Sequence, residues 1–118
     1  VDRCLERGIA VMPGVATPTE IEMALSRGLA LVKLFPAEAM GGVGYIAAVA
    51  APYRQVRFVP TGGVKPANLA DYLALKPVAA CGGTWIATAE AIAAGRWDEI
   101  ERLAAEAVAI VRQARPGA

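Results

Sequence analysis

The sequence predicts an α/β fold in which helices cover a parallel sheet. Short apolar runs recur about every 21–26 residues, a spacing typical of strand–helix units with short loops. Each run ends in a loop that contains Pro or Gly, and an amphipathic segment follows it. Because the runs are continuously apolar rather than alternating, they favour strands that are buried on both faces.

The expected strands lie at residues 9–12, 31–35, 56–60 and 78–81. The first helix has a well-defined start, because Thr17 can cap it, Pro18 suits its first position and Glu20 completes a capping box. Further helices are expected at 43–51, from Pro66 onward with Leu69, Tyr72 and Leu73 on one face, briefly after Thr88, and at 98–114. Four such units fit either a doubly wound sheet or half of a (β/α)8 barrel, and composition does not choose between them.

Composition restricts the chemistry. The 118 residues are 56% hydrophobic and 19% charged, with a net charge of +1, which gives no reason to expect nucleic acid or an anionic membrane as a partner. No apolar run approaches the roughly 18 residues that a membrane helix needs. The chain has no histidine, so it offers no Ser-His or Cys-His pair and no evident transition-metal site. Cys4 and Cys81 are interpreted as buried free thiols.

Lys33 is the single charge in the apolar run at 29–35. Burial disfavours the ammonium form of lysine and so yields the neutral amine that attacks carbonyl groups. An edge strand, or a side chain that extends to the rim of the sheet, would account for Lys33 without any chemistry. Strand alternation places Leu31, Lys33 and Phe35 on one face. Phe35 could there supply an apolar wall for a small substrate, or merely fill the interior of a barrel.

Two consecutive expected strands end in loops that combine paired glycines with a threonine. Thr61, Gly62 and Gly63 follow the third strand, and Gly82, Gly83 and Thr84 follow the fourth. Paired glycines let backbone N–H groups approach an anion, and a helix N-terminus that follows would add positive charge. Phosphate binding is therefore predicted, with ordinary turn chemistry as the alternative.

Glu38 follows Lys33 by five residues and could relay protons to the amine. It could equally be a solvent-facing carboxylate or part of a helix start.

Taken together, these motifs resemble the family of KDPG aldolases, which cleave 2-keto-3-deoxy-6-phosphogluconate. The matching stretches are MPGVAT (12–17), VKLFPAE (32–38), QVRFVPTGGV (55–64), PAN (66–68), DYLAL (71–75) and GGTW (82–85). They cover nearly the whole chain in order and without a large gap.

The resemblance implies a (β/α)8 barrel of which residues 1–118 form the C-terminal half, as one partial domain. It implies a class I aldolase, a carbon–carbon lyase that needs no metal or other cofactor and is usually a homotrimer. By the resemblance, Lys33 is the Schiff-base lysine and Phe35 lines the pyruvate pocket. Thr61, Gly62 and Gly63 form the loop on the substrate and phosphate side. Gly82, Gly83 and Thr84 form a second phosphate loop, where many relatives have serine in place of threonine.

The implied substrate is a phosphorylated 2-keto acid that is cleaved to pyruvate and glyceraldehyde 3-phosphate. Members of the same family act instead on 4-hydroxy-2-oxoglutarate or on the phosphogalactonate epimer. A non-catalytic half-barrel that binds phosphate is the alternative from another class of protein.

Two parts of the family's site have no counterpart here. The general-base glutamate and the carboxylate-binding arginine lie in a Glu-x-x-x-Arg pattern on an early strand, with a threonine on the next. We interpret the chain as part of a longer protein, and expect the 118 residues alone to fold poorly and to lack useful aldolase activity. A cytoplasmic location is expected only by default, because the start of the longer protein is not available for a targeting argument.

Overall fold

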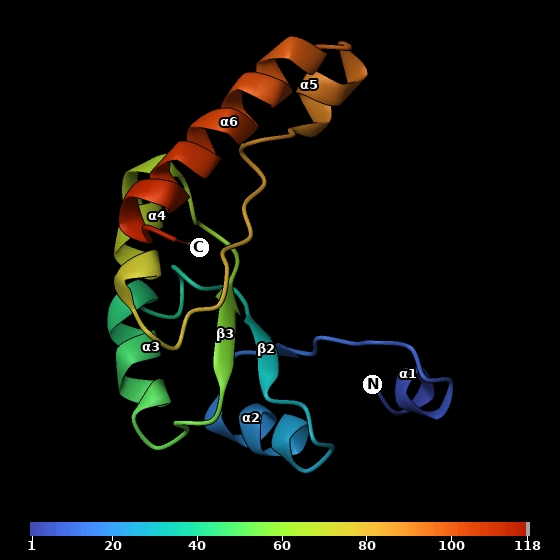
Figure 1. Cartoon of the computed structure of the whole chain (residues 1–118). Coiled ribbons are helices and arrows are strands. Elements are labelled where there is room, and N and C mark those ends of the chain that lie inside the picture. The colour runs from blue at the N-terminus through green and yellow to red at the C-terminus, as the bar shows by residue number, and fades with distance from the viewer. Residues whose placement is uncertain (118) are drawn as a thin grey trace.

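A computed structural model describes residues 1–117 as a three-stranded parallel sheet with six helices around it (Figure 1). The strands are β1 (Gly14–Val15), β2 (Leu31–Leu34) and β3 (Arg57–Pro60), and β2 lies in the middle. The register places Gly14 and Val59 on either side of Lys33. The sequence-based prediction of a parallel α/β fold is therefore confirmed.

Helices α2 (Pro18–Leu25), α3 (Gly42–Ala50) and α4 (Pro66–Ala74) supply the side chains that bury one face of this sheet. In the core, every second side chain of the strands packs against one side of each of these three helices. Its fully buried large side chains are Ile21, Val32, Leu34, Ile46, Val56, Phe58, Tyr72 and Val78, together with Pro60. Because a strand's side chains alternate between faces, the same pattern sends Lys33 and its neighbours to the opposite face.

That opposite face is open within the described residues. Leu31 is 45% and Phe35 51% exposed, although both are large and apolar. The expectation that residues 31–35 are buried on both faces is therefore wrong for this chain, because helices cover only the face that carries Val32 and Leu34.

The first strand lies later than predicted. Residues 9–12 form no strand, and Ile9 and Met12 are exposed. Pairing begins instead where the Lys33 amide donates to the carbonyl of Pro13 (2.9 Å) and the Phe35 amide donates to that of Val15 (3.1 Å). Val15 is buried against the core, and this burial explains why the strand starts after the proline.

The fourth expected strand, at 78–81, is replaced by two isolated parallel bridges to β3. Phe58 pairs with Val78, and Thr61 pairs with Gly82. Ladder hydrogen bonds form at each bridge, from the amide of Ala79 to the Phe58 carbonyl (2.8 Å) and from that of Gly82 to the Pro60 carbonyl (2.9 Å). Where four strand–helix units were predicted, residues 1–117 therefore show three strands and a bridged segment, so the fourth strand is not confirmed.

Most ends of the predicted helices lie within one or two residues of those in the structure. Thr17 caps α2 and forms the capping box with Glu20, as expected. Leu69, Tyr72 and Leu73 are the buried residues of α4. Two short helices, α1 (Asp2–Glu6) and α5 (Ala89–Ala93), lie at the periphery. None of the helices within residues 1–117 has both the length and the hydropathy that crossing a membrane requires.

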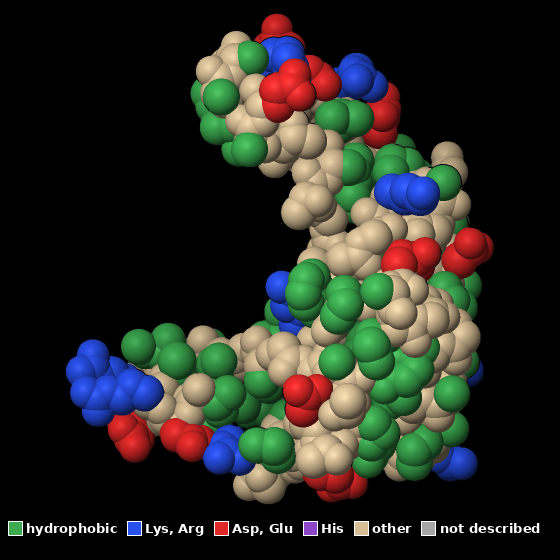
Figure 2. Space-filling view, turned by 180° about the vertical axis from the view of Figure 1, so that it is seen from behind, with side chains coloured by type: hydrophobic (Ala, Val, Ile, Leu, Met, Phe, Trp, Pro, Cys, Tyr) green, Lys and Arg blue, Asp and Glu red, His purple; other side chains and the backbone are tan. Residues whose placement is uncertain are grey.

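The last helix, α6 (Trp97–Ala114), packs along α4 and carries α5 away from the sheet (Figure 1). Ala107 is the one buried residue of α6, and the apolar Val108 beside it is 46% exposed. Arg115 fixes the end of this helix by donating to the carbonyls of Leu73, Leu75 and Val78. In the space-filling view the surface is deeply hollowed between the α1 end and the α5–α6 end (Figure 2).

In the protein expressed from its complete reading frame, replacing Thr17 with alanine should lower stability by about 1 kcal/mol, because the hydroxyl accepts from the Glu20 amide at the start of α2. The free energy of unfolding in urea measures this loss. Thr19→Ala is the matched control, since it removes a hydroxyl from the same first turn without removing a cap. Equal losses in the two variants would contradict the capping role.

Candidate active site

The predicted site residues converge at the carboxyl ends of β2 and β3. Backbone hydrogen bonds join the two loops there. The Ala37 amide donates to the Thr61 carbonyl (2.8 Å), and the Glu38 amide donates to the Gly62 carbonyl (3.0 Å). The bridge between Thr61 and Gly82 brings the third loop to the same edge. Residues that are far apart in the sequence therefore form one continuous rim.

Lys33 lies in the middle strand, half-buried, with its side chain on the open face. Its Nζ is 5.0 Å from the centroid of the Phe35 ring, close enough for a cation–π interaction. No ion pair within residues 1–117 involves Lys33. Its neighbour on β1 is Gly14, and a Cβ placed on that glycine would meet no atom within 4 Å. The amine thus has free space on the β1 side.

Phe35 stands between Lys33 and the first glycine loop. A Cβ on Gly62 would lie 3.1 Å from the Phe35 ring, so the ring packs directly on the loop's backbone. With half of its surface exposed, Phe35 still presents an apolar wall beside the amine. The expected arrangement of Lys33, Phe35 and the Gly62–Gly63 loop is present.

Thr61 links the two glycine loops. A Cβ on Gly82 would lie 2.6 Å from the Thr61 Oγ1, so only glycine permits this approach. On the other side of Thr61, its amide donates to the Leu34 carbonyl (2.9 Å).

The second loop differs from the expectation in one respect. Helix α5 starts only at Ala89, capped by Thr88, so Gly82, Gly83 and Thr84 do not lead directly into a helix N-terminus. The ring of Trp85 occupies the place where a Cβ on Gly83 would lie. Thr84 is exposed beside it. An anion at this loop would therefore depend on the loop's own backbone and hydroxyl groups.

Glu38 does not meet Lys33. Its carboxylate accepts a hydrogen bond from the Tyr72 hydroxyl of α4, a helix on the covered face, and no ion pair within residues 1–117 joins it to the amine. Sequence reasoning treated Tyr72 only as a core position. The available signal was its hydroxyl, because a buried tyrosine needs a hydrogen-bond partner.

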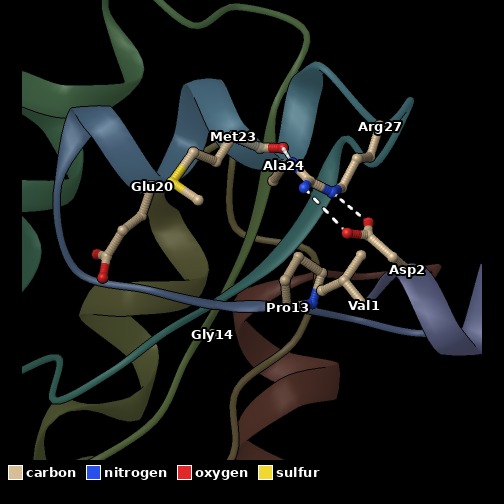
Figure 3. A pocket seen from close by; sticks show the side chains of 8 residues that line it. All are labelled: Val1, Asp2, Pro13, Gly14, Glu20, Met23, Ala24 and Arg27. Atoms are coloured by element: carbon tan, nitrogen blue, oxygen red, sulfur yellow. Dashed lines mark hydrogen bonds and ion pairs between the residues drawn. The ribbon is translucent and has the colours of Figure 1, made fainter.

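The described residues contain no group of three or more His, Cys, Asp or Glu side chains that could hold a metal. Figure 3 shows a pocket of about 320 Å³ between α1 and α2, beside the ion pair of Asp2 and Arg27. Of the residues that contact Lys33 in the sheet, Pro13 and Gly14 line this pocket, but Lys33 itself does not. It depends on α1, which has no buried residue, so we do not assign it as the site.

The family model for KDPG and KHG aldolases matches residues 1–103. A curated relative from Treponema pallidum, 2-dehydro-3-deoxy-phosphogluconate aldolase, is 48% identical over 111 residues, which cover 94% of this chain and 53% of that protein. Lys33, in the middle strand of the sheet, is the type of residue that can form a Schiff base with a carbonyl compound. The chain belongs to the KDPG and KHG aldolase family.

Two solved structures carry further information. KDPG aldolase from Legionella pneumophila, with pyruvate captured as a covalent carbinolamine, has a TM-score of 0.77 and 41% identity, over 80% of this chain and 46% of that one. The aldolase of Zymomonas mobilis with 3-phosphoglycerate has a TM-score of 0.80 and 36% identity, over 88% and 48%. The chain spans about half the length of the curated relatives it matches.

Cys81, at the start of the second glycine loop, is a free and half-buried thiol, as is Cys4. Burial raises the pKa of Cys81 to about 11. Since only the thiolate reacts with iodoacetamide, alkylation of a Cys4→Ser variant should stay slow at neutral pH and reach half its maximal rate near pH 11. Mass spectrometry follows the reaction.

Unfolding in urea is the control for this measurement, because it should return the midpoint toward the ordinary thiol value of 9.0. A midpoint near that value in the folded chain would refute the burial of the thiol.

Proposed function

We propose that this chain contributes the Schiff-base half of a class I aldolase that cleaves 2-keto-3-deoxy-6-phosphogluconate to pyruvate and glyceraldehyde 3-phosphate. The observation that carries the proposal is the position of Lys33. Its amine lies 5.0 Å from the centroid of the Phe35 ring, and in the register of the sheet Lys33 stands between Gly14 of β1 and Val59 of β3. The Legionella relative with its captured pyruvate supports the same chemistry.

The bond changes follow from a nucleophilic amine. The neutral amine of Lys33 attacks C2 of the keto acid to give a carbinolamine, which loses water to form an iminium ion. When a base removes the proton of the C4 hydroxyl, the C3–C4 bond breaks and its electron pair moves into the iminium. This leaves an enamine and releases the aldehyde. Protonation of the enamine at C3, followed by addition of water to C2, releases pyruvate and restores the amine.

The residues of this chain account for part of that sequence. Lys33 is the nucleophile, and Phe35 excludes water from one side of it. By the resemblance, the base and the carboxylate-binding arginine belong to a stretch of the relatives outside the half that this chain spans. Glu38 is not assigned as the base, because its carboxylate is bonded to Tyr72.

Phosphate recognition falls to the loops at Thr61–Gly63 and Gly82–Thr84. Their close packing leaves little room for side chains, which suits backbone donors to an anion. The relative from Zymomonas with 3-phosphoglycerate supports a phosphorylated substrate.

The family description favours a second candidate, the cleavage of 4-hydroxy-2-oxoglutarate, which yields glyoxylate in place of the phosphorylated aldehyde. Phosphogalactonate remains a third substrate of the same class. Measuring kcat/KM for each of the three substrates with the same protein distinguishes these candidates. A non-catalytic phosphate-binding module would bind inorganic phosphate but would form no adduct with pyruvate.

We further propose a homotrimer for the complete protein, which analytical ultracentrifugation tests. The free cysteines fit a cytoplasmic, reducing compartment.

Borohydride reduction in the presence of pyruvate should attach one reduced pyruvate to Lys33 of the protein expressed from its complete reading frame. The Lys33→Arg variant should gain none, because arginine keeps the charge but offers no nucleophilic amine. Peptide mass spectrometry locates the adduct.

The chain has three lysines, and the exposed Lys76 provides the matched control. Lys76→Arg should be labelled as fully as the wild type. An adduct on another lysine, or turnover retained by Lys33→Arg, would refute the assignment. A wild-type protein without any adduct would favour the binding module.

A further inference from the structure

The Glu38 side chain has an unusual amount of contact for an exposed carboxylate. A Cβ added to Gly63 would lie 2.4 Å from the Glu38 Cγ and 2.5 Å from its Cβ, so the stem of the side chain lies directly on the glycine backbone. Its amide meanwhile donates to the Gly62 carbonyl. Glu38 therefore contacts both glycines of the first predicted phosphate loop.

The carboxylate itself is held by Tyr72. This tyrosine is fully buried in α4, and its hydroxyl donates to the Glu38 Oε1. Burial, reinforced by the neighbouring Glu38, raises the pKa of Tyr72, so the hydroxyl remains a donor at neutral pH. A hydrogen bond to a charged acceptor is among the stronger ones in proteins.

Both glycines have left-handed backbone, with φ +85° at Gly63 and +93° at Gly62, which glycine adopts freely and which leaves the loop without side chains of its own to hold its shape. The loop's other restraint is Asn68, whose Nδ2 donates to the Gly63 carbonyl (3.2 Å). Phe35 packs on Gly62 from the strand side. The two glycines are thus confined between Phe35, Glu38 and Asn68.

We propose that Tyr72 is a positioning residue that holds the Glu38 carboxylate on the α4 side and so fixes the Gly62–Gly63 loop in the shape that binds the substrate phosphate. The inference rests on the proposed function, in which this loop carries the phosphate. It replaces the proton-relay role first considered for Glu38.

The electrostatics supply the second reason for this pair. A carboxylate free to turn toward a phosphate bound at the same loop would repel it. The hydrogen bond from Tyr72 keeps the negative charge of Glu38 on the side of α4, so that only the nonpolar stem of Glu38 contacts the loop. Loss of the hydroxyl should therefore weaken phosphate binding in two ways, through loop mobility and through charge.

The test compares variants of the protein expressed from its complete reading frame. Tyr72→Phe should raise the KM for the phosphorylated substrate about tenfold, with kcat changed less than about threefold, because one charged hydrogen bond is lost. Glu38→Ala should also raise the KM, but by less, because it loosens the loop without leaving a free carboxylate to repel the phosphate. Glu38→Gln should stay within about threefold of wild type in KM and kcat, since its amide oxygen still accepts from Tyr72.

Combining Tyr72→Phe with Glu38→Ala should add little to either single change, because both remove the same contact. Tyr45→Phe is the matched control, since it deletes a half-buried tyrosine hydroxyl that donates to the Ala16 carbonyl (2.6 Å). It should lower the melting temperature without changing the KM.

Three results would overturn the proposal. The first is a loss of kcat in Glu38→Gln as large as in Glu38→Ala, which would restore the proton relay. The second is a Tyr72→Phe variant that melts earlier but keeps its KM, as Tyr45→Phe is expected to do. The third is unaltered binding of inorganic phosphate, followed by NMR, in both Tyr72→Phe and Glu38→Ala.

If Tyr72→Phe fails to fold, the two Glu38 variants decide between the roles. The phosphate titration needs no turnover. Failure of the aldolase proposal would instead appear as a wild-type protein that traps no pyruvate on Lys33, so the two failures are distinguishable.

Discussion

The backbone bonds between the loops that follow β2 and β3 determine the geometry of the candidate site. The amides of Ala37 and Glu38 donate to the carbonyls of Thr61 and Gly62, which continues the pairing of the strands beyond their ends. The register of the sheet therefore sets the distance from Lys33 to the glycine loops. Side chains only refine that placement. This suits the proposed site, in which an amine and a phosphate-binding loop are held at a fixed separation.

Much of the fold could be predicted because its signals are local. Thr17, Pro18 and Glu20 specify the start of α2 through contacts within one turn. The position of the first strand was not predictable in this way. Residues 9–12 have the more apolar sequence, but Val15 is the residue that reaches the core, and this depends on partners that lie far along the chain. The open face of the sheet could not be predicted either, because a continuous apolar run in the sequence does not reveal whether a second layer covers that face.

The candidate site, like the fold, combines features that could be predicted from the sequence with features that could not. Candidate residues could be proposed from the sequence, because a lone lysine in an apolar strand and paired glycines in loops both require an explanation. The environment of Glu38 was not. Its partner, Tyr72, lies 34 positions away, and sequence reasoning placed Tyr72 only on the same helix face as Leu69 and Leu73. A buried tyrosine on such a helix is a useful signal, since leucine or phenylalanine would fill the same space without needing an acceptor.

The contacts that hold the end of α6 and those that hold the start of α2 should respond differently to acid. The three bonds of Arg115 to the carbonyls of Leu73, Leu75 and Val78 involve no group that titrates in the acid range. The start of α2 is different. Hydrogen bonds from Ala16 and Thr17 lower the pKa of Glu20, so its stabilisation is present above the ordinary glutamate pKa of 4.5 and is lost as the pH falls through the lowered value. Acidification should therefore loosen α2 while the anchor that holds α6 against α4 persists.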